Sequence, residues 1–176
     1  MDVFWRHTRY AMVAPSGLPV AAELPERFVA VKLYAGPALS LDPDTQDSVR
    51  ALVARAAATA PVVLLENELG LDEHRDLALG NMPNVTSAAP LMRPENNLAV
   101  QIALIARAQM FLGSCGGLAW LAPFLGTPTI GLYDSDRLLT PHLSTVRQAG
   151  RGVSAAEFMP LDLRAVRWLN LAAPSM

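Results

Sequence analysis

The sequence predicts an α/β protein, a three-layer α/β/α sandwich built around a parallel sheet. Three observations indicate this class. Short apolar runs typical of buried strands alternate along the chain with longer segments of helical periodicity. Between two of those runs lies a glycine turn followed by a helix, which is the order of a βαβ unit. Hydrophobic residues make up 52% of the 176 residues, enough for one sizeable core.

Residues 1–27 are expected to form a connector or arm, and residues 28–176 one domain. Three prolines and a glycine fall between positions 15 and 25, and the aromatic side chains of Phe4, Trp5 and Tyr10 precede them. These large side chains have no obvious place in the sheet. They are therefore expected to promote self-association into a homodimer; the alternative is that they fold back onto the tail helices of the same chain, near Trp168, which would leave a monomer.

The domain is predicted to begin with a strand, a helix and a second strand. The apolar run at 28–34 indicates a buried parallel strand. Asp44 or Thr45 is expected to cap the helix, which ends at Pro61 because proline cannot continue it. A second apolar run at 62–65 is the next strand.

The middle of the domain is predicted as a short helix, a strand and a longer helix. The short helix is expected around 72–79 and the third strand at 85–88. The longer helix spans 98–108, with Asn96 or Asn97 as its cap. This helix is almost entirely apolar or alanine, which predicts burial between layers.

Two further strands are predicted at 110–113 and 128–133, and two tail helices at 141–148 and 161–169. Parallel strands end at the same edge of a sheet. Ligands of such sheets bind outside the carboxyl ends of the strands, where the strand order switches. We therefore expect the loops after the first four strands to meet at one site.

The most informative segment contains the glycine turn at 113–117. Gly113, Gly116 and Gly117 leave room for a ligand to approach the backbone. The amides and the dipole of the following helix, which is expected to stop at Gly126, favour a phosphate there. The glycine spacing differs from the dinucleotide-binding G-x-G-x-x-G motif, and the lysine of a P-loop is missing.

The same segment resembles the carboxy-terminal half of GT-B glycosyltransferases, particularly the heptosyltransferase-like group. Those enzymes carry a small-residue turn, a helix with His-Leu-Ala, and a G-x-P-x-(I/V)-x-L-(Y/F) strand. This chain has Trp120-Leu121-Ala122 and then Gly-Thr-Pro-Thr-Ile-Gly-Leu-Tyr at 126–133. The resemblance covers about residues 28–150. It implies that 28–176 is a Rossmann-like nucleotide-sugar-binding domain, half of a GT-B architecture.

The resemblance implies that the chain is the donor-binding half of a glycosyltransferase, which transfers a sugar from a nucleoside diphosphate sugar to an acceptor. The acceptor site and the catalytic base would belong to a missing amino-terminal domain, so the chain alone is expected to be inactive. Two alternatives stay open. One is a non-catalytic nucleotide or sugar-phosphate binding module, and the other is a structural or partner-binding domain. No cofactor, metal site or catalytic residue is expected within the chain.

Eleven residues are candidates for binding the nucleotide-sugar. They are Lys32, Tyr34, Glu66, Leu91, Met92, Asn97, Gly113, Ser114, Cys115, Gly116 and Gly117. A basic residue after the first strand contacts donor phosphate in the related enzymes, whereas the structural alternative for Lys32 is an ion pair with Glu66 or Glu68. Glu66 would hold ribose or sugar hydroxyls, or be a solvated loop acid.

The other candidates also have two interpretations each. Leu91 and Met92 would cover a nucleobase or form a hydrophobic plug. Asn97 is first a helix cap and only secondarily a ligand contact. Ser114 and Cys115 could donate hydrogen bonds to phosphate, while Trp120 is expected to pack in the core below the turn.

Charge and cysteine content exclude other classes. The net charge is -2, which argues against a nucleic-acid partner. A single cysteine excludes an intramolecular disulfide and suits a reducing compartment, so a cytoplasmic protein is expected. No stretch approaches the roughly 18 uninterrupted apolar residues of a membrane span.

Overall fold

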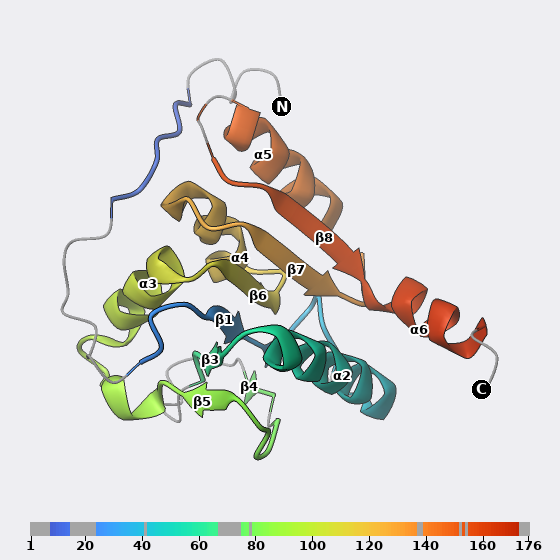
Figure 1. Cartoon of the computed structure of the whole chain (residues 1–176). Helices are drawn as coiled ribbons and strands as arrows, with labels where there is room; N and C mark the ends of the chain where they lie inside the picture. Colours follow the sequence, from blue (N-terminus) through green and yellow to red (C-terminus); the bar gives the residue numbers. More distant parts are fainter. Residues whose placement is uncertain are drawn as a thin grey trace.

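The computed structural model describes residues 8–14, 24–40, 42–66, 75–77, 79–136, 139–151, 153 and 155–172. Its centre is a six-stranded parallel sheet flanked by helices, so the predicted Rossmann-like α/β sandwich is confirmed (Figure 1). Across the sheet the strand order is β5-β3-β1-β6-β7-β8. The strands are β1 (Val29–Lys32), β3 (Val62–Leu64), β5 (Val85–Ser87), β6 (Met110–Ser114), β7 (Thr129–Tyr133) and β8 (Phe158–Asp162).

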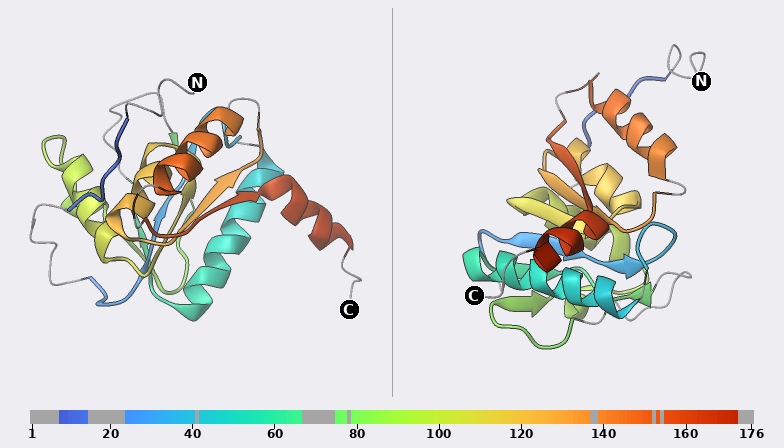
Figure 2. Two further views of the ribbon diagram at one scale, coloured as in Figure 1. Left: turned by 90° about the horizontal axis from the view of Figure 1, so that it is seen from above. Right: turned by 90° about the vertical axis from the view of Figure 1, so that its right-hand side faces the viewer.

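Helices cover both faces of this sheet (Figure 2). They are α2 (Pro43–Thr59), α3 (Asn97–Arg107), α4 (Gly117–Leu121), α5 (Leu139–Arg151) and α6 (Leu163–Ala172). β1 shows how the two cores form. Val29 and Val31 pack in the core that includes α2, while Phe28 and Ala30 pack in the core that includes α3 and α4. Because β1 is buried on both faces, its sequence is a continuous apolar run rather than an alternating one.

The cap of α2 is Asp42, not Asp44 or Thr45 as the sequence predicted. The carboxylate of Asp42 accepts a hydrogen bond from the backbone N–H of Thr45 at 2.9 Å. Pro43 occupies the first turn of the helix, where its missing N–H costs nothing. The capping side chain therefore comes before this proline, and Asp44 lies inside the first turn.

The predicted short helix around 72–79 is wrong where the structure describes this segment. Arg75 and Asp76 form β4, which pairs antiparallel with β2 (Tyr34–Ala35). The pairing with β2 and the ion pair between Asp76 and Lys32 outweigh the weak local helix signal. Residues 72–74 and 78 of the predicted helix lie outside the described residues.

Helix α3 begins within one residue of its predicted position, but it is not buried between layers. Leu104 and Ile105 are fully buried in the core, whereas Leu98 in the first turn is 59% exposed. Asn96 is the residue before the helix, although its side chain makes no capping hydrogen bond. Alanine tolerates either environment, so the composition of α3 alone did not show that its first turn is exposed.

The tail of the domain contains a strand that the sequence analysis missed. β8 lies beside β7, with Pro160 opposite Gly131. Proline interrupts strand patterns because it lacks an N–H group, and it is tolerated at the edge of a sheet. The two predicted tail helices are confirmed as α5, which extends beyond the predicted range at both ends, and α6, which is shifted by two to three residues.

The described part of the amino-terminal arm lies against the domain. The ring of Tyr10 is 6.2 Å from that of Phe124, and the N–H of Val13 donates to the carbonyl of Phe124 at 2.8 Å. Phe4 and Trp5 lie outside the described residues. No helix in the described part of the chain is long and apolar enough to cross a membrane.

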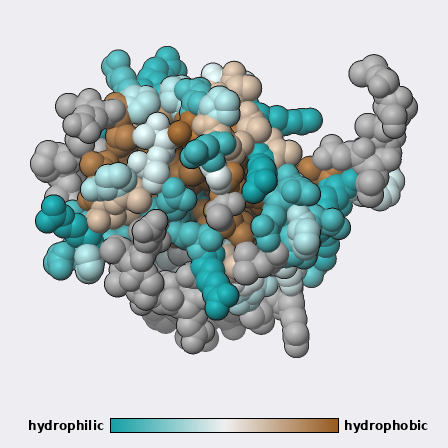
Figure 3. Space-filling view, turned by 90° about the horizontal axis from the view of Figure 1, so that it is seen from below, coloured by the Kyte–Doolittle hydropathy of each residue, from teal (hydrophilic) through white to brown (hydrophobic). Residues whose placement is uncertain are grey.

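The surface mixes polar and apolar side chains. In Figure 3 polar side chains cover much of the outer face, and apolar side chains gather toward its middle. The most exposed large apolar side chain among those described is Trp168 of α6, at 68%. The homodimer predicted from the sequence stays a prediction.

Candidate ligand-binding site

A cavity of about 260 Å³ lies beyond the carboxyl ends of β1, β6 and β7. The chain extends the sheet from β1 to β3 and β5 on one side and from β6 to β7 and β8 on the other, so the strand order switches between β1 and β6. Open α/β sheets bind ligands at this switch point. The described residues that line the cavity are Tyr34, Gly36, Pro37, Ala38, Leu39, Ser114, Cys115, Gly116, Gly117, Trp120, Ser135, Leu139 and His142.

The glycine turn contributes one wall of this cavity. Residues 114–117 all line it, whereas Gly113 lies inside β6 opposite Lys32 of β1. Helix α4 begins at Gly117, and the first N–H groups of a helix have no acceptor within it. The helical segment stops at Gly126, whose φ of 84° is left-handed, as the sequence predicted.

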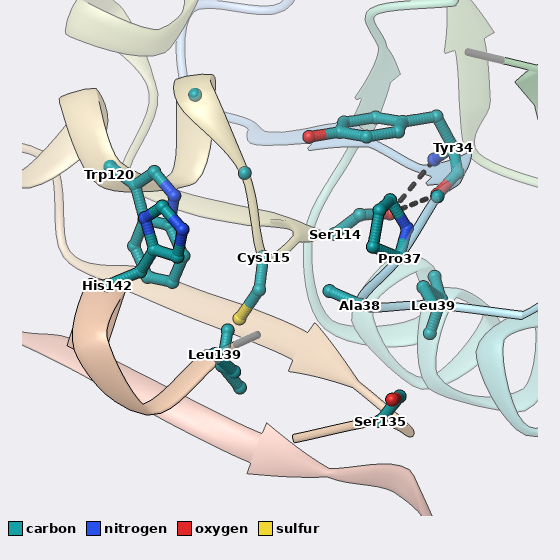
Figure 4. Close-up of a pocket in the computed structure, with 13 residues that line it drawn as sticks. Tyr34, Pro37, Ala38, Leu39, Ser114, Cys115, Trp120, Ser135, Leu139 and His142 are labelled. Atoms are coloured by element: carbon teal, nitrogen blue, oxygen red, sulfur yellow. Dashed lines mark hydrogen bonds between the residues drawn. The ribbon is translucent and has the colours of Figure 1, made fainter. Parts of the chain in front are cut away.

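Ser114 connects the turn to the neighbouring wall. Its hydroxyl accepts a hydrogen bond from the N–H of Tyr34 and donates one to the carbonyl of Tyr34, each at 2.9 Å (Figure 4). The hydroxyl hydrogen is therefore directed to the backbone of β2 rather than into the cavity. Ser114 fixes the relative positions of two elements that are 80 residues apart in sequence.

The side chain of Tyr34 lies against the glycine turn. A side chain at Gly116 would overlap the hydroxyl oxygen of Tyr34, and it would lie 2.9 Å from the ring carbon that carries this oxygen. The absence of a side chain at 116 thus lets the phenol lie directly against the backbone. By contrast, nothing lies within 4 Å of the place where a side chain on Gly117 would begin.

Cys115 is buried at the floor of the cavity. Its thiol points toward β7, where a side chain on Gly131 would lie 2.8 Å from Sγ. Burial raises the pKa of Cys115 to about 12, so the thiol is protonated at neutral pH. Since the thiolate is the nucleophile, this cysteine does not supply one.

The sequence predicted that Trp120 packs in the core below the turn, but its side chain has a second role. It lines the cavity and faces His142 of α5, with the two rings within 7° of parallel and their centroids 6.3 Å apart. On β8, the ring of Phe158 lies 5.2 Å from the indole. The sequence analysis did not predict that His142 lies near the glycine turn. The available signal was that α5 follows β7 and so begins at the ligand edge of the sheet.

The loop at 36–39 forms the opposite wall, and Asp134 at the end of β7 holds it. The N–H of Asp134 donates to the carbonyl of Ala38 at 2.9 Å. Its carboxylate accepts hydrogen bonds from the N–H of Ser40 at 3.1 Å and from the hydroxyl of Thr45 at 2.8 Å. Sequence reasoning missed Asp134, although a carboxylate directly after a buried strand at the ligand edge was a usable signal.

Two predicted site residues lie away from the cavity lining. Lys32 is 9% exposed and forms an ion pair with Asp76 at 2.7 Å, a different partner from Glu66 or Glu68. Glu66 lies beside Leu77 in a separate small cavity. A contact between either residue and a ligand stays a prediction.

Leu91 and Met92, predicted to cover a nucleobase, and Asn97, predicted as a helix cap and secondarily a ligand contact, also lie elsewhere. Met92 is 6% exposed and belongs to the core beneath α3, and Leu91 packs against the same core. The side-chain oxygen of Asn97 accepts a hydrogen bond from Gln101 at 2.8 Å. The loop after β5 therefore supplies packing, and none of these three lines the cavity at the switch point.

Across the described residues, no group of three or more His, Cys, Asp or Glu side chains is arranged to hold a metal ion. Tyr34, Cys115 and His142 are the ionisable side chains in the described lining, which contains no carboxylate.

No protein-family model matches the chain, and no curated protein is significantly similar to it.

Proposed function

We propose that this chain binds a nucleoside diphosphate sugar in the switch-point cavity, as the donor-binding half of a glycosyltransferase. One observation carries the proposal: the cavity lies at the change in strand order, and its wall is the same glycine turn that carries the resemblance to GT-B enzymes. A nucleotide-binding site is expected at this position of a parallel sheet.

The chemistry of the wall suits a diphosphate held by backbone groups. The described lining has no lysine, arginine or carboxylate, so charge neutralisation would come from N–H groups at the start of α4 and from their dipoles. Gly117 leaves that approach open, because nothing lies within 4 Å of the place where its side chain would begin. The same donors would stabilise the diphosphate as it leaves the sugar.

The chain would not complete the transfer by itself. Activating an acceptor hydroxyl requires a general base within hydrogen-bond reach. The described lining offers no carboxylate, Cys115 is protonated, and we assign the imidazole of His142, which faces Trp120, to ligand binding rather than to proton transfer. A second domain would supply the base and the acceptor site. The same observation favours the second candidate, a nucleotide-binding module without catalysis.

The proposal is tested by calorimetric titration of the full chain with nucleoside diphosphates and their sugars. The Gly117→Val variant should lose binding, because its side chain enters open space beside the turn without a clash within the protein. Gly150→Ala is the matched control, since its added methyl meets only Ala155 at 3.8 Å and lies outside the cavity. Equal affinity of Gly117→Val and the parent chain, with both folded, would exclude this site.

Sugar transfer distinguishes the two candidates. Binding that prefers the sugar-linked diphosphate over the free diphosphate supports the transferase half. Indifference to the sugar supports the module. Turnover of a nucleotide-sugar onto an acceptor by the isolated chain would contradict both.

A further inference from the structure

The cavity is lined by two nearly parallel aromatic rings that come from different helices. The indole of Trp120 and the imidazole of His142 are within 7° of parallel, with centroids 6.3 Å apart. Figure 4 shows the two rings one over the other rather than side by side. The two rings therefore face one another within the cavity.

This spacing is close to what a third ring needs. Carbon atoms in van der Waals contact lie about 3.5–4.0 Å apart, so two directly stacked rings would be that close. One flat ring between two others requires about 7–8 Å between the outer planes, twice that contact distance. The observed centroid spacing of 6.3 Å falls short of this by about 0.7–1.7 Å.

We infer that Trp120 and His142 form a slot that holds a flat heteroaromatic ring, the nucleobase of the bound nucleotide. Both residues line the cavity beside the glycine turn, so a base in the slot and a diphosphate at the turn would belong to one ligand. The inference deepens the proposed function and rests on it for identifying the ring as a nucleobase.

The two walls of the slot differ in freedom. Trp120 is partly buried and packs against Phe158, at 5.2 Å between ring centroids and an angle of 50°. His142 is exposed on α5. The indole is therefore the fixed wall, and a rotamer adjustment of His142 can supply the small opening that a ring requires.

The slot also replaces the base-binding surface expected from the sequence. Leu91 and Met92 pack with the core that includes residues of α3 and α4, and they do not line the cavity. Aromatic slots accept any base, since every base has a π face. The slot therefore selects a flat ring but does not distinguish one nucleobase from another.

The test titrates the full chain with three kinds of probe: ADP and UDP, adenosine and uridine, and inorganic pyrophosphate. His142→Ala should weaken ADP and adenosine binding about 10-fold and leave pyrophosphate binding unchanged. His142→Phe keeps a ring at this position and should restore the affinity. Because His142 is exposed, both variants should fold as the parent does; Ser144→Ala on the same helix is the control.

The outcomes separate the slot from the proposed function. Diphosphate binding that His142→Ala does not change, or that it weakens equally for pyrophosphate and ADP, overturns the slot and leaves the phosphate site standing. Nucleoside binding that depends on His142 without any diphosphate binding supports the slot and overturns the donor-binding function. If none of the probes binds the parent chain, both proposals fail.

Discussion

The hydroxyl group of Tyr34 occupies the space that a side chain at position 116 would need. Gly116 and Tyr34 are thus a matched pair: the missing side chain on the turn lets the phenol close over it. Since the same turn forms the proposed phosphate site, the position of Tyr34 sets how much of the backbone a ligand can reach.

We expect Gly116→Ala to destabilise the protein by about 1–3 kcal/mol, because the methyl group displaces the Tyr34 ring. Gly117→Ala, with open space around its methyl, should cost much less. Urea denaturation measures both. In the double variant Gly116→Ala/Tyr34→Ala the clash is gone, so the two costs should not add. Equal stability of the two single alanine variants would contradict this contact.

Ser114→Ala should destabilise the protein by about 1–3 kcal/mol, since it removes both hydrogen bonds to the backbone of Tyr34 in a buried setting. Ser144→Ala, which removes an exposed hydroxyl from α5, is the matched control and should change stability by less than about 0.5 kcal/mol. Denaturation midpoints measure the difference. Similar effects of the two variants would show that Ser114 does not connect β6 to β2 energetically.

The candidate site and the fold were predictable to different extents. β6, the turn, Gly126 and β7 were predicted within one or two residues, because glycine and proline bound two apolar runs there. β8 was missed because Pro160 interrupts its apolar pattern. β4 was missed because a strand of two residues is too short to show a periodic pattern.

The cavity required tertiary information that no local pattern contains. Trp120 and His142 are on different helices, and Ser40 meets Asp134 across 94 positions. Strand order alone placed these loops at one edge, but it did not specify which side chains turn toward one another. The partner of Lys32 was missed for the same reason, because Asp76 reaches it only through the pairing of β2 with β4.

Asp76→Asn should be more destabilising than Lys32→Met. Removing the carboxylate leaves the ammonium of Lys32 in a site where the side chain is only 10% exposed, whereas Asp76 keeps 20% exposure. Breaking such a pair costs about 3 kcal/mol when the remaining charge is buried. Lys32→Met should also leave ADP affinity unchanged if Lys32 has only this structural role. A loss of ADP affinity with unaltered stability would instead support the predicted contact with phosphate.

Cys115 should react slowly with a thiol reagent such as DTNB in the native protein. Burial raises its pKa to about 12, and the chain contains no other cysteine to obscure the result. The unfolded thiol deprotonates near pH 9 while the folded thiol does not, so this group's contribution to stability falls as the pH rises from about 9 toward 12. Fast labelling of the native protein at pH 8 would contradict the buried position.

Asp42→Ala should destabilise α2 by about 1 kcal/mol at neutral pH, the usual cost of losing an N-cap. Hydrogen bonds from the Ser40 hydroxyl, then from the hydroxyl and N–H of Thr45, lower the pKa of Asp42 to about 2. The unfolded carboxyl keeps its ordinary value of 3.8, so the stabilisation is complete above that pH and is lost as the pH falls through about 2.

Urea titrations of the parent chain and Asp42→Ala should therefore show a constant difference from pH 7 to about pH 5, which shrinks between about pH 4 and pH 2. Asp44→Ala is the control, because Asp44 lies in the first turn and contributes only through the helix dipole, about 0.3–1 kcal/mol. If Asp44→Ala proves the more costly variant, the cap is at Asp44, and the hydrogen bond between Asp42 and Thr45 does not determine where α2 begins.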